Sequence, residues 1–423
     1  MIDFLPSDRL PLLQTMEQKT YPFPLKGVDS DALYVMEKLR QAGYTAYLVG
    51  GSVRDLILQK TPKDYDISTS AKPEEIKRLF RNCILIGRRF RLAHIRFGKK
   101  ILEVSTFRTG DLETDALIVR DNEWGNPEQD VLRRDFTING LFYDPSTETI
   151  IDYVEGYPDL QKKYLRTIGQ PYLRFRQDPV RMLRLLKFQA RFGFEIDKEA
   201  HISLLECRHE ILKSSPSRVF EELLRMLESG SAKPFFKLLA EHGMLQMLLP
   251  ALSKFLDTPD GKEIYDYLEE VDTTFHAPGE PLLERPVLLA CLVFPFLQKK
   301  LSSLSHIPHL GEIQQTAYNL IDEIFQPFFP VPRMLKMIVV SVLTAQYRIT
   351  PLEKKKPHRI RIPHDPDFGL ALKFLDLRAC LEPALQTIWE DWDYAYSNLD
   401  QEALPVRRKT RSRPRRRPPR RTS

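Results

Sequence analysis

The chain has 423 residues, of which 42% are hydrophobic and 28% are charged. These proportions are typical of folded globular domains and exclude a wholly disordered chain. It holds 63 Lys and Arg against 57 Asp and Glu, but ten of the basic residues lie within 407–421, a stretch without acids. The other 53 bases and 57 acids leave residues 1–406 with a net charge of −4, so the basic character belongs to the C-terminal end.

The apolar pattern disfavours a membrane protein and a secreted protein. No run reaches the ~18 uninterrupted apolar residues of a membrane-spanning helix, which predicts no membrane insertion. Asp3, Asp8 and Arg9 stand where a signal peptide would have its apolar core. We therefore expect a cytoplasmic protein, whose four cysteines are too far apart for a metal knuckle and stay reduced.

Strand and helix patterns alternate in the first third of the chain. Residues 1–27 show no periodicity and are expected to form an extended N-terminal extension, followed by a helix from near Ser30 to Gly43. Strand patterns follow at 46–49, 64–67, 83–86, 92–97, 101–107, 137–143 and 149–153. Helices are expected at 52–58 and after Ser70, and 108–132 indicates a long polar loop. Together these patterns predict a small mixed sheet with two helices.

Beyond residue 178 the pattern becomes helical. Asp178-Pro179 combines an N-cap with a proline in the first turn, and the apolar face that follows ends at Gly193. Ser215-Pro216 predicts another helix of this kind, and helical patterns continue to residue 382. The expected fold class is therefore α+β, a mixed sheet followed by an all-helical part.

Gly50-Gly51-Ser52 lies between a predicted strand and a predicted helix. Glycines let the backbone approach a ligand closely, and the free N–H groups at a helix start favour phosphate oxygens. A tight structural turn would account for the same residues about equally well.

Three acidic residues are candidates for binding a divalent cation. Asp64 and Asp66, two apart in a predicted strand, would share one face of the sheet roughly 6 to 7 Å apart, where like charges repel unless a cation lies beside them. Glu103 lies in an apolar run, where an unpaired carboxylate is costly to bury. If its strand neighbours that of Asp64 and Asp66, the three carboxylates form a cradle for Mg²⁺. Solvated acids at strand ends are the alternative.

Basic residues gather in three places. One face of the helix after Asp178 would line a nucleotide groove or, more commonly, be solvated; its members are Arg181, Arg184, Lys187 and Arg191. Residues 87–94 combine arginines with rings that suit phosphates and bases; these arginines are Arg88, Arg89 and Arg91. His94, in the same stretch, is given no chemical role. The C-terminal tract binds polyanions without reading sequence; its RNA-binding candidates are Arg407, Arg408, Arg415, Arg416 and Arg417.

Five motifs, in order along the chain, resemble those of class II nucleotidyltransferases, the family that contains bacterial poly(A) polymerases and CCA-adding enzymes. They are LVGGSVRDL at 48–56, PKDYDI at 62–67, EVSTFR at 103–108, RRDFTIN at 133–139 and DPVRMLR at 178–184. Within the family, IGRRFRLAHI at 86–95, FLDLRA at 374–379 and the arginine-rich end resemble the bacterial poly(A) polymerase branch. The resemblance covers nearly the whole chain and is strongest up to about residue 250.

The resemblance implies an organisation and a set of site residues. It implies a nucleotidyltransferase head at 28–165, a helical neck at 166–250 that binds nucleotide and RNA, a helical body and tail at 251–404, and a disordered RNA-binding tail at 405–423. Metal binding is implied for Asp64 and Asp66, and further catalytic roles for Glu103 and Asp135. The residues implied to bind the nucleotide are Gly50, Gly51, Ser52, Arg54, Arg134, Asp178, Arg181 and Arg184. Two positions depart from the family pattern, Gln177 where Glu is common and Gln59 where Gly is usual.

The implied reaction is template-independent transfer of AMP from ATP to RNA 3′ ends, with Mg²⁺ as the cofactor and proteins of the RNA-decay machinery as further partners. Two alternatives remain. A tRNA CCA-adding enzyme would use CTP and ATP and stop after three nucleotides, and a non-catalytic RNA-binding protein would bind RNA through its tail.

Overall fold

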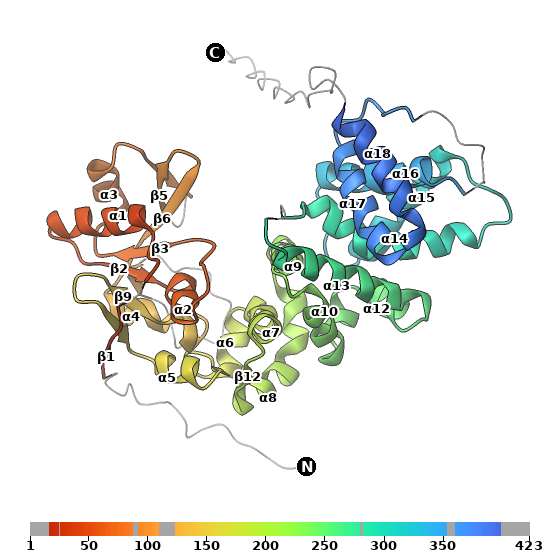
Figure 1. Cartoon of the computed structure of the whole chain (residues 1–423). Coiled ribbons are helices and arrows are strands. Elements are labelled where there is room, and N and C mark those ends of the chain that lie inside the picture. Colours follow the sequence, from red (N-terminus) through yellow and green to blue (C-terminus); the bar gives the residue numbers. More distant parts are fainter. Residues whose placement is uncertain are drawn as a thin grey trace, which may run out of the picture. The chain divides into compact units, whose positions relative to one another are not determined.

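The computed structural model describes residues 17–24, 26–87, 92–109, 123–279, 282–352 and 360–398. Arg88, Arg89, Arg91 and the tail 405–423 lie outside these residues. The chain divides into two compact units, Met1–Glu222 with Lys237–Met244 and Leu223–Phe236 with Leu245–Ser423 (Figure 1). The five segments expected from the sequence are a finer division and stay a prediction.

A mixed sheet of eight strands forms the core of the first unit. Its strands, in the order in which they lie side by side, are β1 (Lys19–Pro22), β10 (Thr149–Asp152), β9 (Phe142–Asp144), β2 (Ala46–Val49), β3 (Asp66–Thr69), β6 (Lys100–Thr106), β5 (Leu92–Phe97) and β4 (Cys83–Ile86). The β3 and β6 strands run parallel, whereas the other neighbours are antiparallel.

Two helices cover one face of this sheet. The other face carries polar residues on β3 and β6, whereas Val49 of β2 and Phe142 of β9 lie there in a buried apolar cluster with Val131. The covered face is apolar and in register from strand to strand, through Leu48, Ile67, Val104 and Ala93. Two helices, α1 (Ser30–Gln41) and α3 (Pro73–Leu79), pack against these strands. Asp29 caps α1, because its carboxylate accepts the N–H groups of Asp31 and Ala32.

The other elements of the first unit are short strands, turns and helices. They are α2 (Gly51–Ile57), β7 (Arg108–Thr109) paired with β8 (Glu123–Trp124), α4 (Pro127–Leu132), the 3₁₀ turn η1 (Thr137–Asn139), α5 (Gly156–Gln161), β11 (Tyr164–Leu165) paired with β12 (Glu195–Ile196), α6 (Pro171–Gln177), α7 (Val180–Phe192), α8 (Lys198–Cys207) and the 3₁₀ turn η2 (Arg208–Lys213). Two helices, α9 (Pro216–Leu227) and α10 (Ala232–Glu241), contribute residues to both units.

The sequence predicted the helices here better than the strands. The helices after Asp178 and Ser215 are confirmed, and Gly193 ends α7 with a left-handed φ of 66°. The strand expected at 137–143 is wrong: η1 replaces its first part, because the Thr137 hydroxyl donates to Asp159 and the Gly140 N–H donates to the Thr137 carbonyl. Also wrong is the capping role of Asp178, whose side chain does not cap α7.

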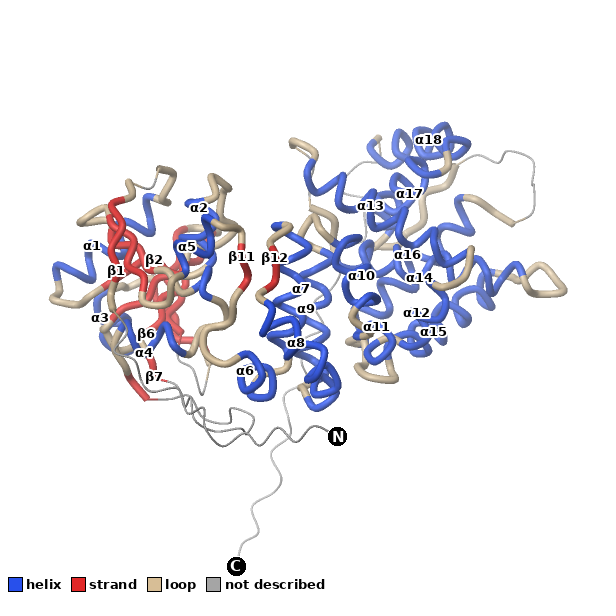
Figure 2. Tube along the Cα trace, turned by 90° about the horizontal axis from the view of Figure 1, so that it is seen from below, coloured by secondary structure: helices blue, strands red, loops and turns tan. Residues whose placement is uncertain are grey.

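The second unit is built of helices (Figure 2). Besides the ends of α9 and α10, it contains α11 (Met244–Leu248), α12 (Pro250–Leu256), the 3₁₀ turn η3 (Asp260–Lys262), α13 (Glu263–His276), α14 (Arg285–Ser302), α15 (Leu310–Phe325), α16 (Arg333–Ile349), α17 (Phe368–Leu381), the 3₁₀ turn η4 (Pro383–Leu385) and α18 (Gln386–Ser397). The apolar helix α14 contacts α13, α15, α16 and α17 and is buried on most of its length. Among the described helices, none has the length and apolar character that crossing a bilayer requires.

Candidate active site

The turn after β2 is built around Gly50. Its φ of 69° and ψ of −131° lie in a region open essentially to glycine, and a Cβ there would come within 3.3 Å of Arg134 Nη1. Gly51 then begins α2. The Ser52 side chain is buried, and its hydroxyl donates to the Val49 carbonyl at 2.9 Å. The turn therefore brings two backbone N–H groups and the Arg134 side chain together at the end of β2.

Two of the predicted carboxylates lie side by side on the open face of the sheet. Asp66, the first residue of β3, is the register partner of Glu103 in β6. Asp64 precedes the strand and is exposed, so the prediction that both aspartates lie within a strand is wrong. Burial, together with the neighbouring Glu103 and Asp64 carboxylates, raises the pKa of Asp66 to about 6, against the opposing effect of Arg134.

Convergence of Asp64, Asp66 and Glu103 on one cation stays a prediction. In the described part of the chain, no three His, Cys, Asp or Glu side chains converge as a ligand set for a metal. Glu103 Oε1 is hydrogen-bonded at 2.9 Å to Nε2 of His94 on β5, the strand that lies on the other side of β6 from β3. Asp64 and Asp66 still fit a divalent cation, because hard cations are often held by one or two carboxylates plus substrate phosphate oxygens.

Arg134 reaches the same face from the C-terminal side of α4. Its guanidinium contacts the Ser68 hydroxyl on β3 at 3.3 Å and lies over the Phe142 ring. Asp130, which is fully buried, holds it through Nη2 at 2.8 Å. Arg134 is thus a fixed cation between the Gly50 turn and Asp66, where phosphate charge would need to be balanced.

Arg54, predicted to receive the triphosphate, is enclosed by the protein. It is 3% exposed and donates to Asp55 at 2.8 and 2.9 Å and to Asn139 at 2.5 Å. Its guanidinium also lies over the rings of Phe188 and Phe192 on α7. These contacts make Arg54 a link between α2 and α7, and its binding of phosphate stays a prediction.

Asp135 is also held by protein groups. Its Oδ1 accepts the Asn139 side-chain amide at 3.0 Å and the Phe136 N–H at 2.9 Å, and its Oδ2 lies 3.6 Å from Arg184. Burial would raise the pKa of Asp135, but Arg184 and the Asn139 hydrogen bond outweigh burial and lower it. A carboxylate held ionised in this way can orient neighbouring groups, and its catalytic role stays a prediction.

The basic face of α7 is partly exposed and is paired with acids of neighbouring helices. Arg184 and Lys187 both bind Glu222 of α9, at 2.9 and 3.2 Å, and Arg191 binds Asp55 of α2 at 3.0 Å. Arg181 is buried and donates to the Arg174 carbonyl at 3.0 Å. These ion pairs join α7 to α2 and α9, and the binding of nucleotide by Arg181 and Arg184 stays a prediction.

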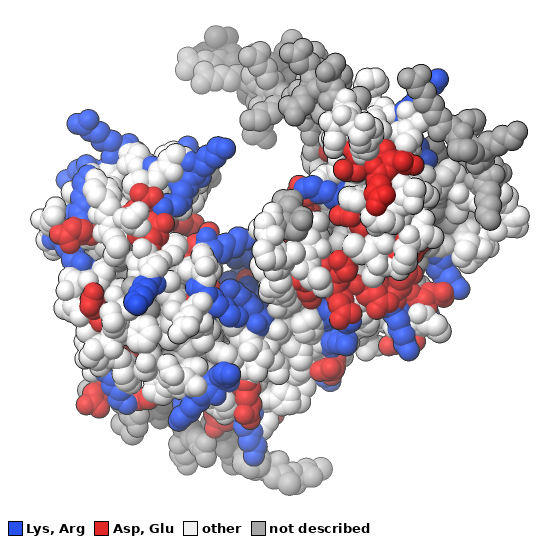
Figure 3. Space-filling view, in the orientation of Figure 1, with Lys and Arg blue, Asp and Glu red and all other residues white. Residues whose placement is uncertain are grey.

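Asp178 has one carboxylate oxygen without a hydrogen-bond donor among the described residues. Its Oδ2 accepts from Arg218 of α9 at 2.9 Å, whereas its Oδ1 is buried and has no hydrogen-bond partner within the described chain. Such an atom is costly to leave without a donor. Figure 3 shows Lys and Arg side chains gathered in the first unit between the sheet and the helices α6 and α7.

Sequence reasoning missed Asp130, Asn139, His94, Arg218 and Glu222. Asn139 and Asp130 lie in or beside the RRDFTIN motif, so the motif itself was a signal for them. Arg218 and Glu222 lie in the helix that Ser215-Pro216 predicts. They are four residues apart, which places both on one face of that helix. Nothing in the local sequence shows which distant acid or base each one meets.

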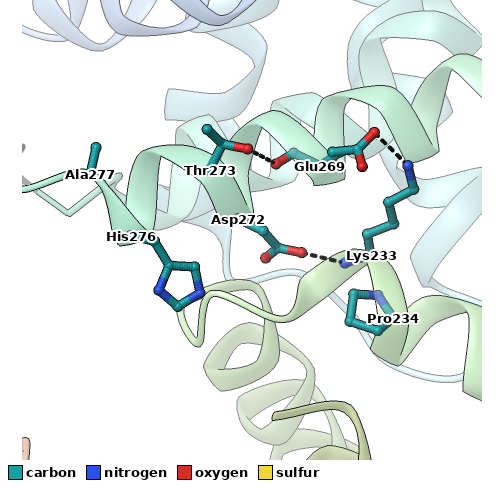
Figure 4. Close-up of a pocket in the computed structure, with 7 residues that line it drawn as sticks. All are labelled: Lys233, Pro234, Glu269, Asp272, Thr273, His276 and Ala277. Atoms are coloured by element: carbon teal, nitrogen blue, oxygen red, sulfur yellow. Dashed lines mark hydrogen bonds and ion pairs between the residues drawn. The ribbon is translucent and has the colours of Figure 1, made fainter. Parts of the chain in front are cut away.

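A pocket in the second unit offers, among the residues described there, no charged side chain that is free to react or to bind a ligand. This pocket of about 590 Å³ is lined by Lys233, Pro234, Glu269, Asp272, Thr273, His276 and Ala277 (Figure 4). Asp272 accepts the N–H groups at the start of α10, Lys233 pairs with Glu269 at 2.6 Å, and His276 contacts the Gly230 carbonyl. Its charged side chains are engaged in holding helices together.

Comparison with known proteins identifies the family. Two family models match, the poly A polymerase head domain over residues 46–166 and the probable RNA and SrmB-binding site of polymerase A over 193–256. The chain is 35% identical to poly(A) polymerase I of Escherichia coli O6:H1, covering 97% of this chain and 94% of that protein. It is 34% identical to the CCA-adding enzyme of Streptococcus gordonii, over 58% of this chain and 60% of that one.

The fold agrees with this likeness. The Bacillus stearothermophilus CCA-adding enzyme in complex with CTP superposes with a TM-score of 0.56 at 24% identity, covering 87% of this chain and 82% of the other. Because the matches include a head domain and a relative above 30% identity along almost the full length, the chain belongs to the nucleotidyltransferase family of poly(A) polymerases and CCA-adding enzymes.

Proposed function

We propose that this nucleotidyltransferase is a poly(A) polymerase that adds AMP from ATP to RNA 3′ ends without a template. The observation that carries the proposal is how much of the chain resembles each of two relatives, a poly(A) polymerase and a CCA-adding enzyme. Identity to poly(A) polymerase I runs through 97% of the chain, including the second unit, whereas identity to the CCA-adding enzyme covers 58%.

The geometry of the first unit fits such a transfer. Asp64 and Asp66 would hold Mg²⁺, which supplies charge neutralisation at the phosphates and lowers the pKa of the attacking 3′-hydroxyl. The Gly50 turn lets the triphosphate approach the backbone N–H groups at the start of α2, and Arg134 adds a fixed positive charge beside them.

Recognition of the base would fall to the region where α7 begins. The Oδ1 atom of Asp178, buried and without a partner in the described chain, is an acceptor suited to the exocyclic amino group of adenine. Arg181 and Arg218 flank it: Arg218 pairs with Oδ2, and Arg181 carries charge close by. Gln177, where relatives commonly have Glu, is buried beside it.

The product of the reaction tests the proposal. A generic RNA is incubated with ATP, CTP, GTP or UTP separately, and the length and base composition of the added tract are measured. A long tract with ATP alone is expected. Addition that needs CTP and stops after three nucleotides would instead make the chain a CCA-adding enzyme, and no addition with any nucleotide would leave an RNA-binding protein.

The carboxylates are tested by the double substitution Asp64→Ala with Asp66→Ala. Addition should be abolished while RNA binding stays nearly intact, because the pair acts on the phosphates and the hydroxyl. Glu148→Ala, an exposed acid in the turn between β9 and β10 of the same sheet, is the matched control and should retain activity. A double variant as active as the parent would refute the assignment.

A further inference from the structure

A row of side chains crosses the open face of the sheet toward the proposed site. Ile84 of β4, His94 of β5, Glu103 of β6 and Asp66 of β3 are register partners in turn. Because directly paired residues of neighbouring strands project to the same face, the His94 ring stands next to the Glu103 carboxylate. Asp66 is the last polar residue of the row, because its other register partner is the buried Val49 of β2.

The contact within this row is a hydrogen bond. His94 Nε2 lies 2.9 Å from Glu103 Oε1, and the His94 side chain is 18% exposed against 47% for Glu103. The imidazole is therefore the less exposed partner, while the carboxylate extends further into solvent. A free glutamate at such a position would sample several rotamers.

We propose that His94 is a positioning residue of the nucleotidyl-transfer site, whose Nε2–H holds Glu103 in place beside Asp66. The inference rests on the proposed function. The hydrogen bond uses one carboxylate oxygen of Glu103 and leaves Oε2 for the side of Asp66 and the phosphates. Partners that orient a site carboxylate in this way typically change activity by about 10- to 100-fold when removed.

The hydrogen bond, and not a positive charge, is what the arrangement requires. A neutral imidazole with its proton on Nε2 is already a donor to Glu103. A glutamine at this position places its Nε2 amide at nearly the same distance from the backbone, whereas a leucine fills a similar volume without a donor. These two substitutions separate donation from packing.

The chain offers a matched control for a His–Glu pair that serves only stability. In the second unit, His306 Nε2 contacts both carboxylate oxygens of Glu312 at 3.0 Å. Exposed pairs of this kind add little to stability. His306→Leu removes such a pair without touching the sheet of the first unit.

The experiment compares His94→Leu, His94→Gln and His306→Leu in the full-length protein. The kcat and KM for ATP, the affinity for RNA and the midpoint of thermal unfolding are measured for each. His94→Leu should lower kcat by about tenfold or more, with KM, RNA affinity and unfolding midpoint little changed. His94→Gln should recover most of kcat, and His306→Leu should match the parent.

Coupling to Glu103 gives the decisive measurement. If His94 acts through Glu103, His94→Leu should cause no further loss in a chain that already carries Glu103→Gln. Independent losses in the double variant, equal loss in the Gln and Leu variants, loss through RNA affinity, or an unchanged kcat in His94→Leu would each overturn the proposal. Failure of the proposed function is distinguishable, because the Asp64→Ala, Asp66→Ala chain would then remain active in the same assay.

Discussion

Gly50 shows how one backbone conformation fixes the arrangement of the candidate site. With φ at 69° and Arg134 Nη1 only 3.3 Å from the place of a Cβ, alanine would be strained and would displace the guanidinium. Gly50→Ala should cost about 1 to 3 kcal/mol of stability and most of the activity. Chemical denaturation and the ATP assay measure the two effects.

Gly51 provides the control for that substitution. It lies in α2 with an ordinary φ, and its Cβ would meet the Arg54 guanidinium at 3.4 Å, an ordinary van der Waals contact. Gly51→Ala should leave stability unchanged or raise it by up to about 1 kcal/mol, since alanine favours a helix. If both alanines destabilise the chain equally, the left-handed turn is not what makes Gly50 necessary.

Asp130 is a fully buried carboxylate whose charge is balanced by two arginines. Burial alone would raise the pKa of Asp130, but Arg134 and Arg133 outweigh it and lower the value. A depressed folded-state pKa stabilises the protein above the unfolded-state pKa of about 4, and this contribution is lost as pH falls through the folded value. The first unit should therefore lose stability on acidification below about pH 4.

Asp130→Asn isolates this contribution. Breaking a fully buried pair costs about 3 to 5 kcal/mol; because Arg133 and Arg134 are 23% and 16% exposed and can rehydrate, we expect about 2 to 3 kcal/mol at pH 7. Denaturation curves of the parent and the variant should converge as pH is lowered below 4. A difference that stays constant with pH would assign the loss to packing rather than to charge.

Helix ends in this chain are stabilised by partners that the local sequence does not contain. Asp272 of α13 accepts the N–H groups of Ala232 at 2.6 Å and Lys233 at 3.0 Å, forty residues earlier in the chain, at the start of α10. Asp272→Ala should cost about 1 to 2 kcal/mol, the usual effect of losing a cap. Chemical denaturation of the full-length protein measures it.

Thr273, the next residue along α13, is the control for the cap. Its hydroxyl donates only to the Glu269 carbonyl in its own helix, at 2.9 Å, a contact that adds little stability. Thr273→Ala should change stability by less than about 0.5 kcal/mol. Equal losses in the two variants would show that the pocket wall, rather than the cap, is sensitive to substitution.

The sequence predicts best those features that depend on residues close together in the chain. Gly193 and Ser215-Pro216 are local signals, and the helices that they bound are correct. The motifs placed Asp66 and Glu103 near each other, and the parallel pairing of β3 and β6 confirms it. Gln59 stands where the family usually has glycine. Its φ of 56° is left-handed, and a left-handed backbone explains why glycine is usual at this position.

The remainder depends on contacts between distant residues. β1 joins the sheet only because β10 pairs with it, and nothing in residues 19–22 shows that partner. The sequence could not show the ion pairs of the basic face of α7, because the acids that pair with it, Asp55 and Glu222, lie far away in the chain. His94 likewise gained a partner only when the antiparallel pairing of β5 with β6 set it beside Glu103.

The distribution of charge over the whole chain leads to a prediction about RNA affinity. Residues 1–406 carry a net charge of −4, and ten bases lie in 407–421. Long-range attraction of RNA should therefore come mainly from the tail. Each phosphate neutralised on a single strand contributes about 0.7 to the slope of log affinity against log salt, so deletion of 405–423 should reduce that slope by as much as about 7.

The effect of the deletion should be confined to binding. RNA affinity is expected to fall most at low salt, where screening is weakest, whereas kcat at saturating RNA should stay unchanged because the carboxylates, Arg134 and the Gly50 turn lie in the first unit. A chain of full length with its ten terminal Lys and Arg replaced by Gln should behave like the deletion, since charge and not length is responsible. If the truncated chain keeps the parent's salt dependence, the phosphate contacts belong instead to the basic side chains between the sheet and α7, and the tail plays no part in holding RNA near the site.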